Sequence, residues 1–352
     1  GVSGGYERPM WFALDGEKAE YEYSYNYQSW YPSAEYETNN TIKNVGLFDL
    51  TPFSKFEIKS NKAHQELQKI CTANIKNEPG KCIYTHMLNP DGGIETDLTV
   101  VCIDNNHFRI ISSAATRERD KFHIKKYLSK DIELKDITDD LCVFGLFGPK
   151  SRDLIKKISQ DNFDNDEFKF STAKYITIEG VKIWAQRLSY VGELGYELYV
   201  DFKDAKKIYE LIINKGKDFN LSNCGMHAMD IMRMESGFLH WGHDISPEEN
   251  QYQAGLSFTI SKKKDVDFIG KKAIEKIKQE KTKTRFAMFT LKESEPGKPL
   301  LLHDEPIYID DKIIGRSTSG NYSFNFKKNL VFGYIQNDLS NEELQSKNLF
   351  AE

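Results

Sequence analysis

Between Val45 and about Lys281, the hydrophobic and polar positions switch repeatedly between a strand period and a helix period. Residues 54–60, SKFEIKS, alternate apolar and polar side chains, which predicts a strand. Residues 61–75 repeat apolar side chains at helical spacing, after Ser60 or Asn61 as a cap. The same pattern predicts strands or hairpins over 96–113, 132–138, 141–148 and 173–190, and helices over 115–130, 150–159, 201–219, 225–238 and 269–281.

The two ends of the chain have other patterns. Residues 1–42 are rich in aromatic side chains and show no regular period over most of their length, so we expect an extended segment that wraps over other parts of the molecule. After about residue 282 the helices give way to short strands, predicted over 284–291, 306–320 and 330–336. Helices and strands do not alternate regularly, which predicts an α+β fold with a small all-β, barrel-like C-terminal domain.

Composition narrows the classes of function. The 352 residues carry a net charge of −5 with acids and bases interspersed, so no nucleic-acid partner is expected. The longest apolar runs, such as residues 141–148, are too short to cross a membrane. Five widely spaced cysteines without a CxxC pair indicate reduced, buried thiols and no zinc site. Abundant Lys, Asn and Ile suggest an AT-rich bacterial genome, and we expect a cytoplasmic bacterial protein.

One candidate functional acid, Asp97, lies in the stretch GGIETDLTVV, residues 92–101. Asp97 lies near the start of a predicted strand, after Gly92 and Gly93, which allow another backbone or a ligand to approach closely. The segment just upstream, YTHMLNP, supplies the aromatic Tyr84 and a histidine. An aspartate at a strand start is often only a turn or cap residue, so a functional and a structural interpretation both stay open.

A second candidate functional acid, Glu193, lies in the stretch RLSYVGELGYELYV, residues 187–200. Glu193 lies between Gly192 and Gly195, with Tyr190 and Tyr196 on either side. A partly buried glutamate is costly unless it is paired or accepts hydrogen bonds, and a heteroaromatic ring with adjacent N–H groups would supply them. An exposed turn acid explains the same residues equally well from this stretch alone.

The stretch MRMESGFLHWGHDI, residues 232–245, gathers polar residues at the end of a predicted helix. Two histidines three residues apart, followed by an aspartate, invite a metal interpretation, but ordinary polar loop residues explain them better, and we predict no metal site. No GxGxxG follows a predicted strand, so no dinucleotide-binding domain is expected in this chain.

Taken in order, these motifs resemble the folate-binding aminomethyltransferase family, the T-protein of the glycine cleavage system. They resemble more closely the C-terminal, tetrahydrofolate-binding half of dimethylglycine and sarcosine dehydrogenases. The matching segments are GLFDLTPFSKFEIKS, YTHMLNPDGGIETDLTVV, SSAATRERD, GLFGPKSRDLI, RLSYVGELGYELYV, AMDIMRMESGF, DFIGKKAI and IGRSTSG. The resemblance implies a T-protein-like cloverleaf of several domains. It divides the chain into a linker over 1–42 that would follow a flavin domain, a folate-binding domain over 43–281 and a C-terminal β domain over 282–352, which we expect to be truncated.

The resemblance also implies roles for individual residues. Glu193 matches the acid that binds the pterin, and Asp97 matches the carboxylate near the folate nitrogens where the one-carbon unit is exchanged. Tyr84 matches an aromatic wall of the folate slot, and Arg233 matches an arginine at a helix end. Tyr190 belongs to the loop of Glu193 and is expected to contact folate.

Some positions depart from the family pattern. Trp241 stands where the family often has Tyr, and Ser113 stands where it has Asn; we count both among the folate-binding positions. Tyr252 and Gln253 replace Pro and Glu. These changes bear on the side of the amine donor and disfavour a standard lipoyl-protein partner.

The resemblance implies an enzyme that binds tetrahydrofolate and captures a one-carbon unit as 5,10-methylenetetrahydrofolate, with Asp97 as its catalytic residue. The donor would be an iminium or formaldehyde equivalent from a methylated amine. FAD would then belong to a missing upstream domain or a partner subunit. Two alternatives stay open, a stand-alone aminomethyltransferase or demethylase, and a non-catalytic folate-binding protein of the same fold.

Overall fold

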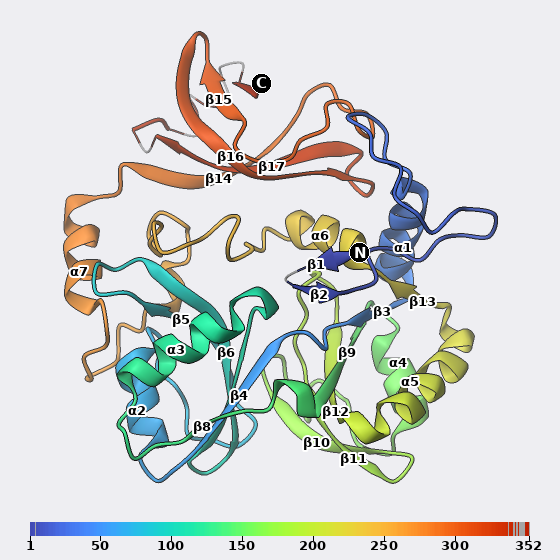
Figure 1. The fold of residues 1–352 in the computed structure, drawn as a ribbon, viewed down its shortest axis with the longest axis vertical. Helices are drawn as coiled ribbons and strands as arrows, with labels where there is room; N and C mark the ends of the chain where they lie inside the picture. The colour runs from blue at the N-terminus through green and yellow to red at the C-terminus, as the bar shows by residue number, and fades with distance from the viewer. Residues whose placement is uncertain (4, 337, 341, 343, 345–348, 352) are drawn as a thin grey trace.

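The chain folds into three lobes around a central helix, as the computed structural model shows for residues 1–3, 5–336, 338–340, 342, 344 and 349–351 (Figure 1). Two sheets lie side by side in the lower half of the view and a third sheet lies above them. None of the helices in these residues is long and apolar enough to cross a bilayer.

The first lobe holds the stretch that carries Asp97. In the described part of the chain its sheet has the strand order β5-β6-β7-β4-β8. Its elements are β4 (Ser54–Lys59), α2 (Ala63–Ile70), β5 (Cys82–Leu88), β6 (Ile94–Asp104), β7 (His107–Ser112), η1 (Ala114–Thr116), α3 (Arg117–Tyr127) and β8 (Leu134–Asp136). The hairpin predicted over 96–113 is confirmed as β6 and β7, which turn at Asn105 and Asn106.

The second lobe holds the stretch that carries Glu193. Its sheet has the strand order β10-β11-β12-β9-β3-β13 among the described residues. Its elements are β3 (Val45–Asp49), η2 (Thr138–Asp140), β9 (Leu141–Phe147), α4 (Ser151–Ile158), β10 (Ala173–Ile178), β11 (Val181–Gln186), β12 (Gly195–Asp201), α5 (Phe202–Gly216), η3 (Lys217–Phe219), β13 (Leu221–Cys224) and α6 (Met226–Glu235). The β10–β11 hairpin turns at Glu179 and Gly180, both with positive φ, as the predicted two-residue turn requires.

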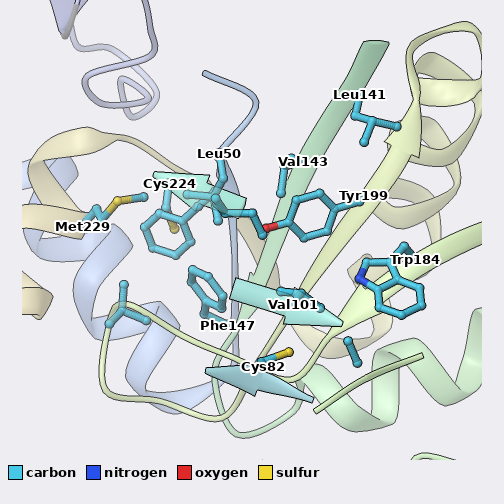
Figure 2. Packing of buried hydrophobic residues seen from close by; sticks show 14 of the residues in the cluster. Leu50, Cys82, Val101, Leu141, Val143, Phe147, Trp184, Tyr199, Cys224 and Met229 are labelled. Carbon is cyan, nitrogen blue, oxygen red and sulfur yellow. The ribbon is translucent and has the colours of Figure 1, made fainter. Parts of the chain in front are cut away.

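A shared hydrophobic core joins these two lobes. Cys82 and Val101 from the first sheet pack against Phe147, Trp184 and Tyr199 from the second, as Figure 2 shows. All of these side chains are buried. The two sheets therefore form one continuous interior, which fixes β5 and β6 relative to the loop between β11 and β12.

The third lobe is the predicted C-terminal β domain. Its described strands pair in the order β14-β17-β16-β15-β18. Its elements, with the preceding η4 and α7, are η4 (Ser257–Thr259), α7 (Lys271–Glu280), β14 (Thr284–Thr290), β15 (Pro306–Ile309), β16 (Lys312–Ser323), β17 (Lys328–Gln336) and β18 (Leu349–Ala351). The division that we set at residue 282 falls between α7 and β14; the three domain boundaries stay predictions.

The N-terminal segment is more ordered than its pattern predicts. It contains β1 (Val2–Ser3), β2 (Tyr6–Glu7) and α1 (Tyr31–Lys43). The prediction of an irregular segment is wrong over α1, because this helix buries polar side chains, among them Glu37, Thr38 and Thr41, and so shows no hydrophobic period. The Glu37 carboxylate accepts hydrogen bonds from the backbone N–H groups of Phe12 and Gly225, which ties the wrapping segment to the start of α6.

Candidate functional site

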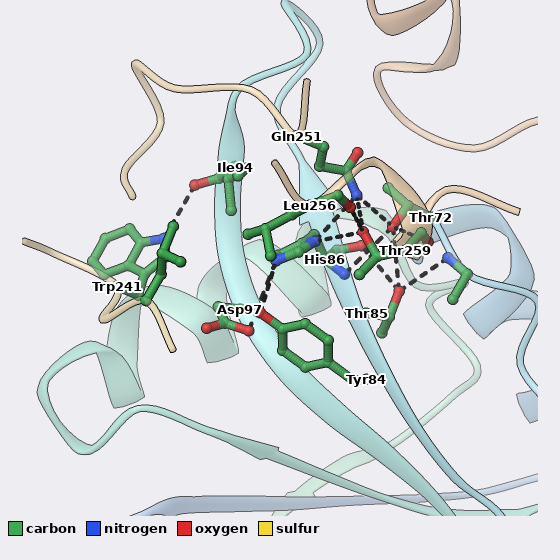
Figure 3. Close-up of polar contacts among 12 residues, drawn as sticks. Thr72, Tyr84, Thr85, His86, Ile94, Asp97, Trp241, Gln251, Leu256 and Thr259 are labelled. Atoms are coloured by element: carbon green, nitrogen blue, oxygen red, sulfur yellow. Dashed lines mark hydrogen bonds and ion pairs between the residues drawn. The ribbon is translucent and has the colours of Figure 1, made fainter. Parts of the chain in front are cut away.

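Asp97 lies on β6 and faces the neighbouring strand β5. His86 is its direct cross-strand partner, so both side chains leave the same face of the sheet. The His86 Nε2 atom lies 3.8 Å from Asp97 Oδ1, and the Tyr84 hydroxyl lies 3.3 Å from the same nitrogen. Figure 3 shows the three side chains converging. The Asp97 side chain keeps 19% of its exposure, so a ligand can reach it.

Burial is the main cause of the shifted pKa values of Asp97, His86 and Tyr84. It raises the pKa of Asp97 to about 7, with the Tyr84 hydrogen bond lowering that pKa and the Asp120 charge raising it. Burial also lowers the pKa of His86 to about 3, so the imidazole is neutral. Burial of its hydroxyl and the Asp97 charge hold the pKa of Tyr84 well above 10. Asp97 is therefore a group that exchanges a proton near neutral pH.

A polar network from a distant segment holds His86 from behind. Thr259 Oγ1 lies 3.0 Å from His86 Nδ1, and Gln251 Nε2 lies 3.1 Å from the same nitrogen. Gln251 also donates to Thr72 Oγ1. The side chains of His86, Gln251 and Thr72 are fully buried. The imidazole beside Asp97 is therefore fixed in orientation by residues more than 160 positions away in sequence.

Asp120, on α3, is a second buried acid next to Asp97. Its Oδ2 atom accepts a hydrogen bond of 2.6 Å from Thr116. Burial raises the pKa of Asp120 to about 6, against lowering by hydroxyl groups and by Arg119. The charge of either carboxylate disfavours ionisation of the other, which helps Asp97 to hold a proton.

Glu193 lies in the loop that joins β11 to β12. Gly192 has φ +77, and a side chain there would collide with the Ser236 hydroxyl, so the loop lies directly against the end of α6. Among the described residues, none donates a hydrogen bond to the Glu193 carboxylate. Burial and the charge of Glu235 raise the pKa of Glu193. Glu235 accepts a hydrogen bond from Ser323, whereas the partly buried Glu193 stays uncompensated and thus favours a ligand that brings N–H donors.

Tyr190 lies in the loop that carries Glu193 and is near enough to Asp97 to feel its charge. Its hydroxyl donates to the Leu239 carbonyl at 2.8 Å, and its ring stacks on Phe238 with the centroids 5.9 Å apart. Its pKa is raised, first by burial, and the charges of Arg233 and Asp97 both act on it. The structure thus brings Tyr190 within electrostatic reach of Asp97 while its loop carries Glu193.

Arg233 has a position that the motif alone did not reveal. Its guanidinium is buried and donates to Asp230 at 2.8 Å, to the Phe238 carbonyl at 3.1 Å, to Asp244 at 2.6 Å and to Ser319 at 2.8 Å. Ser319 belongs to β16, so this network joins α6 to the C-terminal domain. Arg233 therefore has a structural role here, and its contact with folate stays a prediction.

Trp241 and Ser113 border the site less directly. The Trp241 indole donates to the Ile94 carbonyl at 3.1 Å, and the Arg119 guanidinium lies 4.5 Å from its ring centroid. Trp241 therefore packs near the start of the strand that carries Asp97. Ser113 precedes η1, and its carbonyl accepts a hydrogen bond from Ser54. The roles of both in ligand binding stay predictions.

Several residues of the site were missed by sequence reasoning. His86 and Asp120 are buried beside Asp97, Glu235 is adjacent to Glu193, and Phe258 is 74% exposed with its ring 6.4 Å from that of Tyr84. The alternation Tyr84-x-His86 on a strand paired with Asp97 was a usable signal, because it places both side chains on one face. Nothing local distinguishes Phe258 from an ordinary loop aromatic.

Other candidate positions do not belong to this cluster. Among the described residues, no group of His, Cys, Asp or Glu side chains has the arrangement of a metal site. His240 and His243 stack with their rings 4.7 Å apart. Two surface hollows, one beside α5 and one beside α2, contain none of the residues around Asp97 or Glu193.

Sequence comparison places the chain among known proteins. Residues 1–264 match the family described as "GCVT N-terminal domain", and residues 285–347 match "Glycine cleavage T-protein C-terminal barrel domain". The chain is 33% identical to "Dimethylglycine dehydrogenase, mitochondrial" of Rattus norvegicus, over 97% of this chain and 40% of that protein. It is 35% identical to "4-methylaminobutanoate oxidase (formaldehyde-forming)" of Paenarthrobacter nicotinovorans, over 91% of this chain and 39% of that protein. The chain thus spans about two fifths of the length of these relatives.

Comparison with solved structures agrees on the fold. The glycine cleavage system aminomethyltransferase T from Bartonella henselae superposes with a TM-score of 0.81 at 19% identity, covering 96% of this chain and 85% of that one. The prediction of an α+β, T-protein-like fold with a C-terminal β domain is confirmed. The chain belongs to the glycine cleavage T-protein family of folate-dependent one-carbon transferases, and it is homologous to the C-terminal half of dimethylglycine dehydrogenase.

Proposed function

We propose that this chain binds tetrahydrofolate and forms 5,10-methylenetetrahydrofolate from a one-carbon unit released by oxidative demethylation. The observation that carries this proposal is the environment of Asp97, a reachable carboxyl group with a pKa of about 7 beside Tyr84 and the neutral His86. Tetrahydrofolate would supply the nucleophilic nitrogens that bond to the one-carbon unit.

Asp97 would act as general base in this reaction. Its ionised form accepts the proton that a nitrogen loses on bonding to carbon, and it stabilises positive charge that develops nearby. A pKa of about 7 suits both tasks, because the group is readily ionised and readily protonated near neutral pH. The buried Asp120 opposes ionisation of Asp97 and so keeps that balance.

Glu193 would orient the pterin. A planar edge with adjacent N–H donors binds a carboxylate through two parallel hydrogen bonds, and such charge-assisted pairs are strong and selective. Those donors would also offset the repulsion between Glu193 and Glu235. The partly exposed rings of Tyr84 and Phe258 offer apolar walls beside Asp97. Glu193, Asp97 and these two rings therefore fit a long aromatic ligand that carries N–H groups at one end.

The donor is proposed from the relatives. Both similar proteins are named for oxidation of an N-methylated amine, and one of those names specifies formaldehyde as a product. We infer that an iminium or formaldehyde equivalent is the donor here. The methylated amine would be oxidised to this donor on FAD, in a flavin dehydrogenase domain or subunit that lies outside this chain.

Binding of tetrahydrofolate is the first property to test. The purified chain would be titrated anaerobically while tryptophan fluorescence is followed, with Glu193→Ala alongside and with Glu210→Ala, an exposed acid on α5, as the matched control. We expect saturable binding that Glu193→Ala weakens by about tenfold or more and that the control leaves unchanged. Equal affinity of the wild type and Glu193→Ala would contradict the assignment of the pterin to this loop.

A further inference from the structure

The hydrogen bonds behind His86 determine which ring nitrogen carries the hydrogen. The Thr259 hydroxyl donates its only hydrogen to the Leu256 carbonyl, at 2.7 Å. Thr259 Oγ1 is then an acceptor toward its other neighbours, Gln251 Nε2 at 2.5 Å and His86 Nδ1 at 3.0 Å. Gln251 Nε2 also lies 3.1 Å from His86 Nδ1, but its two hydrogens are donated to Thr72 Oγ1 and Thr259 Oγ1. Two acceptors do not face each other at 3.0 Å, so His86 Nδ1 carries the hydrogen and donates it to Thr259.

The opposite nitrogen is consequently an acceptor. His86 is neutral, and with hydrogen on Nδ1 its Nε2 atom presents a lone pair. That lone pair faces the Tyr84 hydroxyl at 3.3 Å and Asp97 Oδ1 at 3.8 Å. The second distance is longer than a hydrogen bond, so His86 acts on Asp97 through Tyr84. Figure 3 shows this order of side chains, from Thr259 through His86 to Tyr84 and Asp97.

The Tyr84 hydroxyl has one hydrogen and two acceptors within reach. When Asp97 is ionised, the hydrogen points to its carboxylate, as the lowering effect of Tyr84 on the pKa of Asp97 indicates. When Asp97 is protonated, its own O–H donates to the Tyr84 oxygen, and the Tyr84 hydrogen turns to His86 Nε2. A bare Nε2 is required for this second arrangement, because an Nε2–H would leave the Tyr84 hydrogen without an acceptor there.

We propose that His86 is a positioning residue that holds the protonated form of Asp97 in place by accepting the Tyr84 hydroxyl hydrogen through Nε2. The role rests on the proposed function of Asp97 as the base of the transfer reaction. Each cycle leaves a proton on Asp97, and the Tyr84–His86 hydrogen bond then gives that acid a fixed orientation until the proton departs. The proton itself stays on Asp97, because the buried imidazole is a much weaker base.

The charged and titratable groups around this unit come from each packed element. Tyr84 belongs to β5, Asp97 to β6, Asp120 to α3 and Tyr190 to the β11–β12 loop. Gln251, Thr259 and Thr72 are neutral, and within the described ranges no Lys or Arg forms an ion pair with Asp97. Protonation of Asp97 is therefore the change near neutral pH to which the Tyr84 hydrogen responds.

The tautomer of His86 is the first test. A long-range ¹H–¹⁵N correlation spectrum of the histidine rings, assigned with His86→Gln, reports which nitrogen carries the hydrogen. We expect hydrogen on Nδ1 and a neutral ring between about pH 5 and about pH 9. A hydrogen on Nε2, or a charged ring in this range, overturns the proposal. This measurement needs no folate, so it is independent of the proposed function.

Thr259 offers a variant that changes the tautomer without touching the site. Thr259→Val removes the acceptor of Nδ1–H, so hydrogen moves to Nε2, which then donates to the Tyr84 oxygen and commits the Tyr84 hydrogen to the Asp97 carboxylate. We expect the pKa of Asp97, followed by ¹³C-aspartate NMR, to fall by about one unit. Thr259→Ser should keep the wild-type value.

Two further variants complete the design. Tyr84→Phe should remove most of the effect of Thr259→Val, because the hydroxyl carries the coupling. His107→Gln, in the neighbouring strand β7 and paired with Glu57, is the matched control and should leave Asp97 unchanged. A shift of the Asp97 pKa that persists at full size in the Tyr84→Phe background overturns the proposal, as does a wild-type pKa in a folded Thr259→Val.

Discussion

Asp97 and Asp244 are two aspartates with opposite surroundings. Asp244 is fully buried and accepts hydrogen bonds from Arg233, Thr318, Ser319 and the backbone of His240. Asp97 is reachable, and Tyr84 is the hydroxyl that acts on its carboxylate, with His86 beyond hydrogen-bond distance. The difference shows how the surroundings of an aspartate determine whether it has a structural or a catalytic role. A carboxylate saturated with donors holds domains together, and one left short of donors keeps a proton to exchange.

The largest expected effect is on turnover, at Asp97, whose carboxylate has few hydrogen-bond donors. Asp97→Ala should lower the rate of one-carbon transfer about 10³-fold, because it removes a positioned general base. The affinity for tetrahydrofolate should stay within about threefold, since Glu193 and the aromatic walls remain. Anaerobic transfer assays and the fluorescence titration separate the two quantities, with Asp104→Ala at the far end of β6 as the control. Abolished binding with residual turnover at saturation would reverse the assignment of roles.

Asp244, whose carboxylate accepts several hydrogen bonds, should instead control the stability of the fold. Asp244→Ala removes one of the two acids paired with the buried Arg233 and the acceptor of the Thr318 and Ser319 hydroxyls, so we expect a loss of about 3 kcal/mol in the free energy of unfolding. Urea unfolding followed by circular dichroism measures it. Asp304→Ala removes an exposed ion pair with Arg316 and should cost less than about 1 kcal/mol. If both variants unfold at the same urea concentration, the network is not what joins α6 to β16.

The pH dependence of stability sharpens the contrast. The folded-state pKa of Asp97, about 7, lies above its unfolded value of about 3.9, so its contribution is fully present below about pH 4 and is lost as pH rises through about 7. Asp97→Asn cannot ionise and should lose about 2 kcal/mol less than the wild type between about pH 5 and about pH 8. Glu197→Gln removes another buried acid with a pKa of about 7 and should flatten the curve similarly without lowering turnover. Identical pH curves for Asp97→Asn and the wild type would count against the raised pKa.

The smallest effect concerns the single hydrogen bond to Asp97. Tyr84→Phe removes a donor to the carboxylate form, so the pKa of Asp97 should rise by less than about one unit. The acid limb of the pH–rate profile reports this shift as a move to higher pH. Tyr175→Phe, on β10, provides a tyrosine control away from the site. A move of the limb to lower pH would mean that Tyr84 favours the protonated acid instead.

Local pattern predicted much of the secondary structure. The strand over 54–60, the hairpin at Glu179 and Gly180 and the long helix after Asp201 follow directly from period and turn chemistry. Helix ends were less well predicted. The helix over 225–238 ends at Glu235, and Gly237 takes a positive φ just beyond it. Helix α1 was missed because tertiary partners, and not a hydrophobic stripe, satisfy its buried polar face.

The site was predictable only in part. The motifs singled out Asp97 and Glu193, but the strand β5 was not predicted, so its pairing with β6 and the contact of His86 with Asp97 were not foreseen. Gln251 and Thr259 reach His86 across more than 160 residues, a proximity that no local pattern encodes. Likewise, one of the hydrogen bonds that Arg233 donates goes to Ser319 on β16, far away in sequence.

The attachment of the N-terminal segment to α6 has a mechanical consequence, to which the Glu37 hydrogen bond from Gly225 contributes. Backbone N–H groups of Met226 and His227 donate to the carbonyls of Pro9 and Met10, so the segment is fastened to the first turn of α6. Arg233 lies in the last turn of that helix, whose ten residues span about 15 Å. A helix of this length behaves as a stiff rod under axial load. Tension on the N-terminal segment would therefore reach the far end of α6 as a displacement of the whole rod, with little of it absorbed by bending.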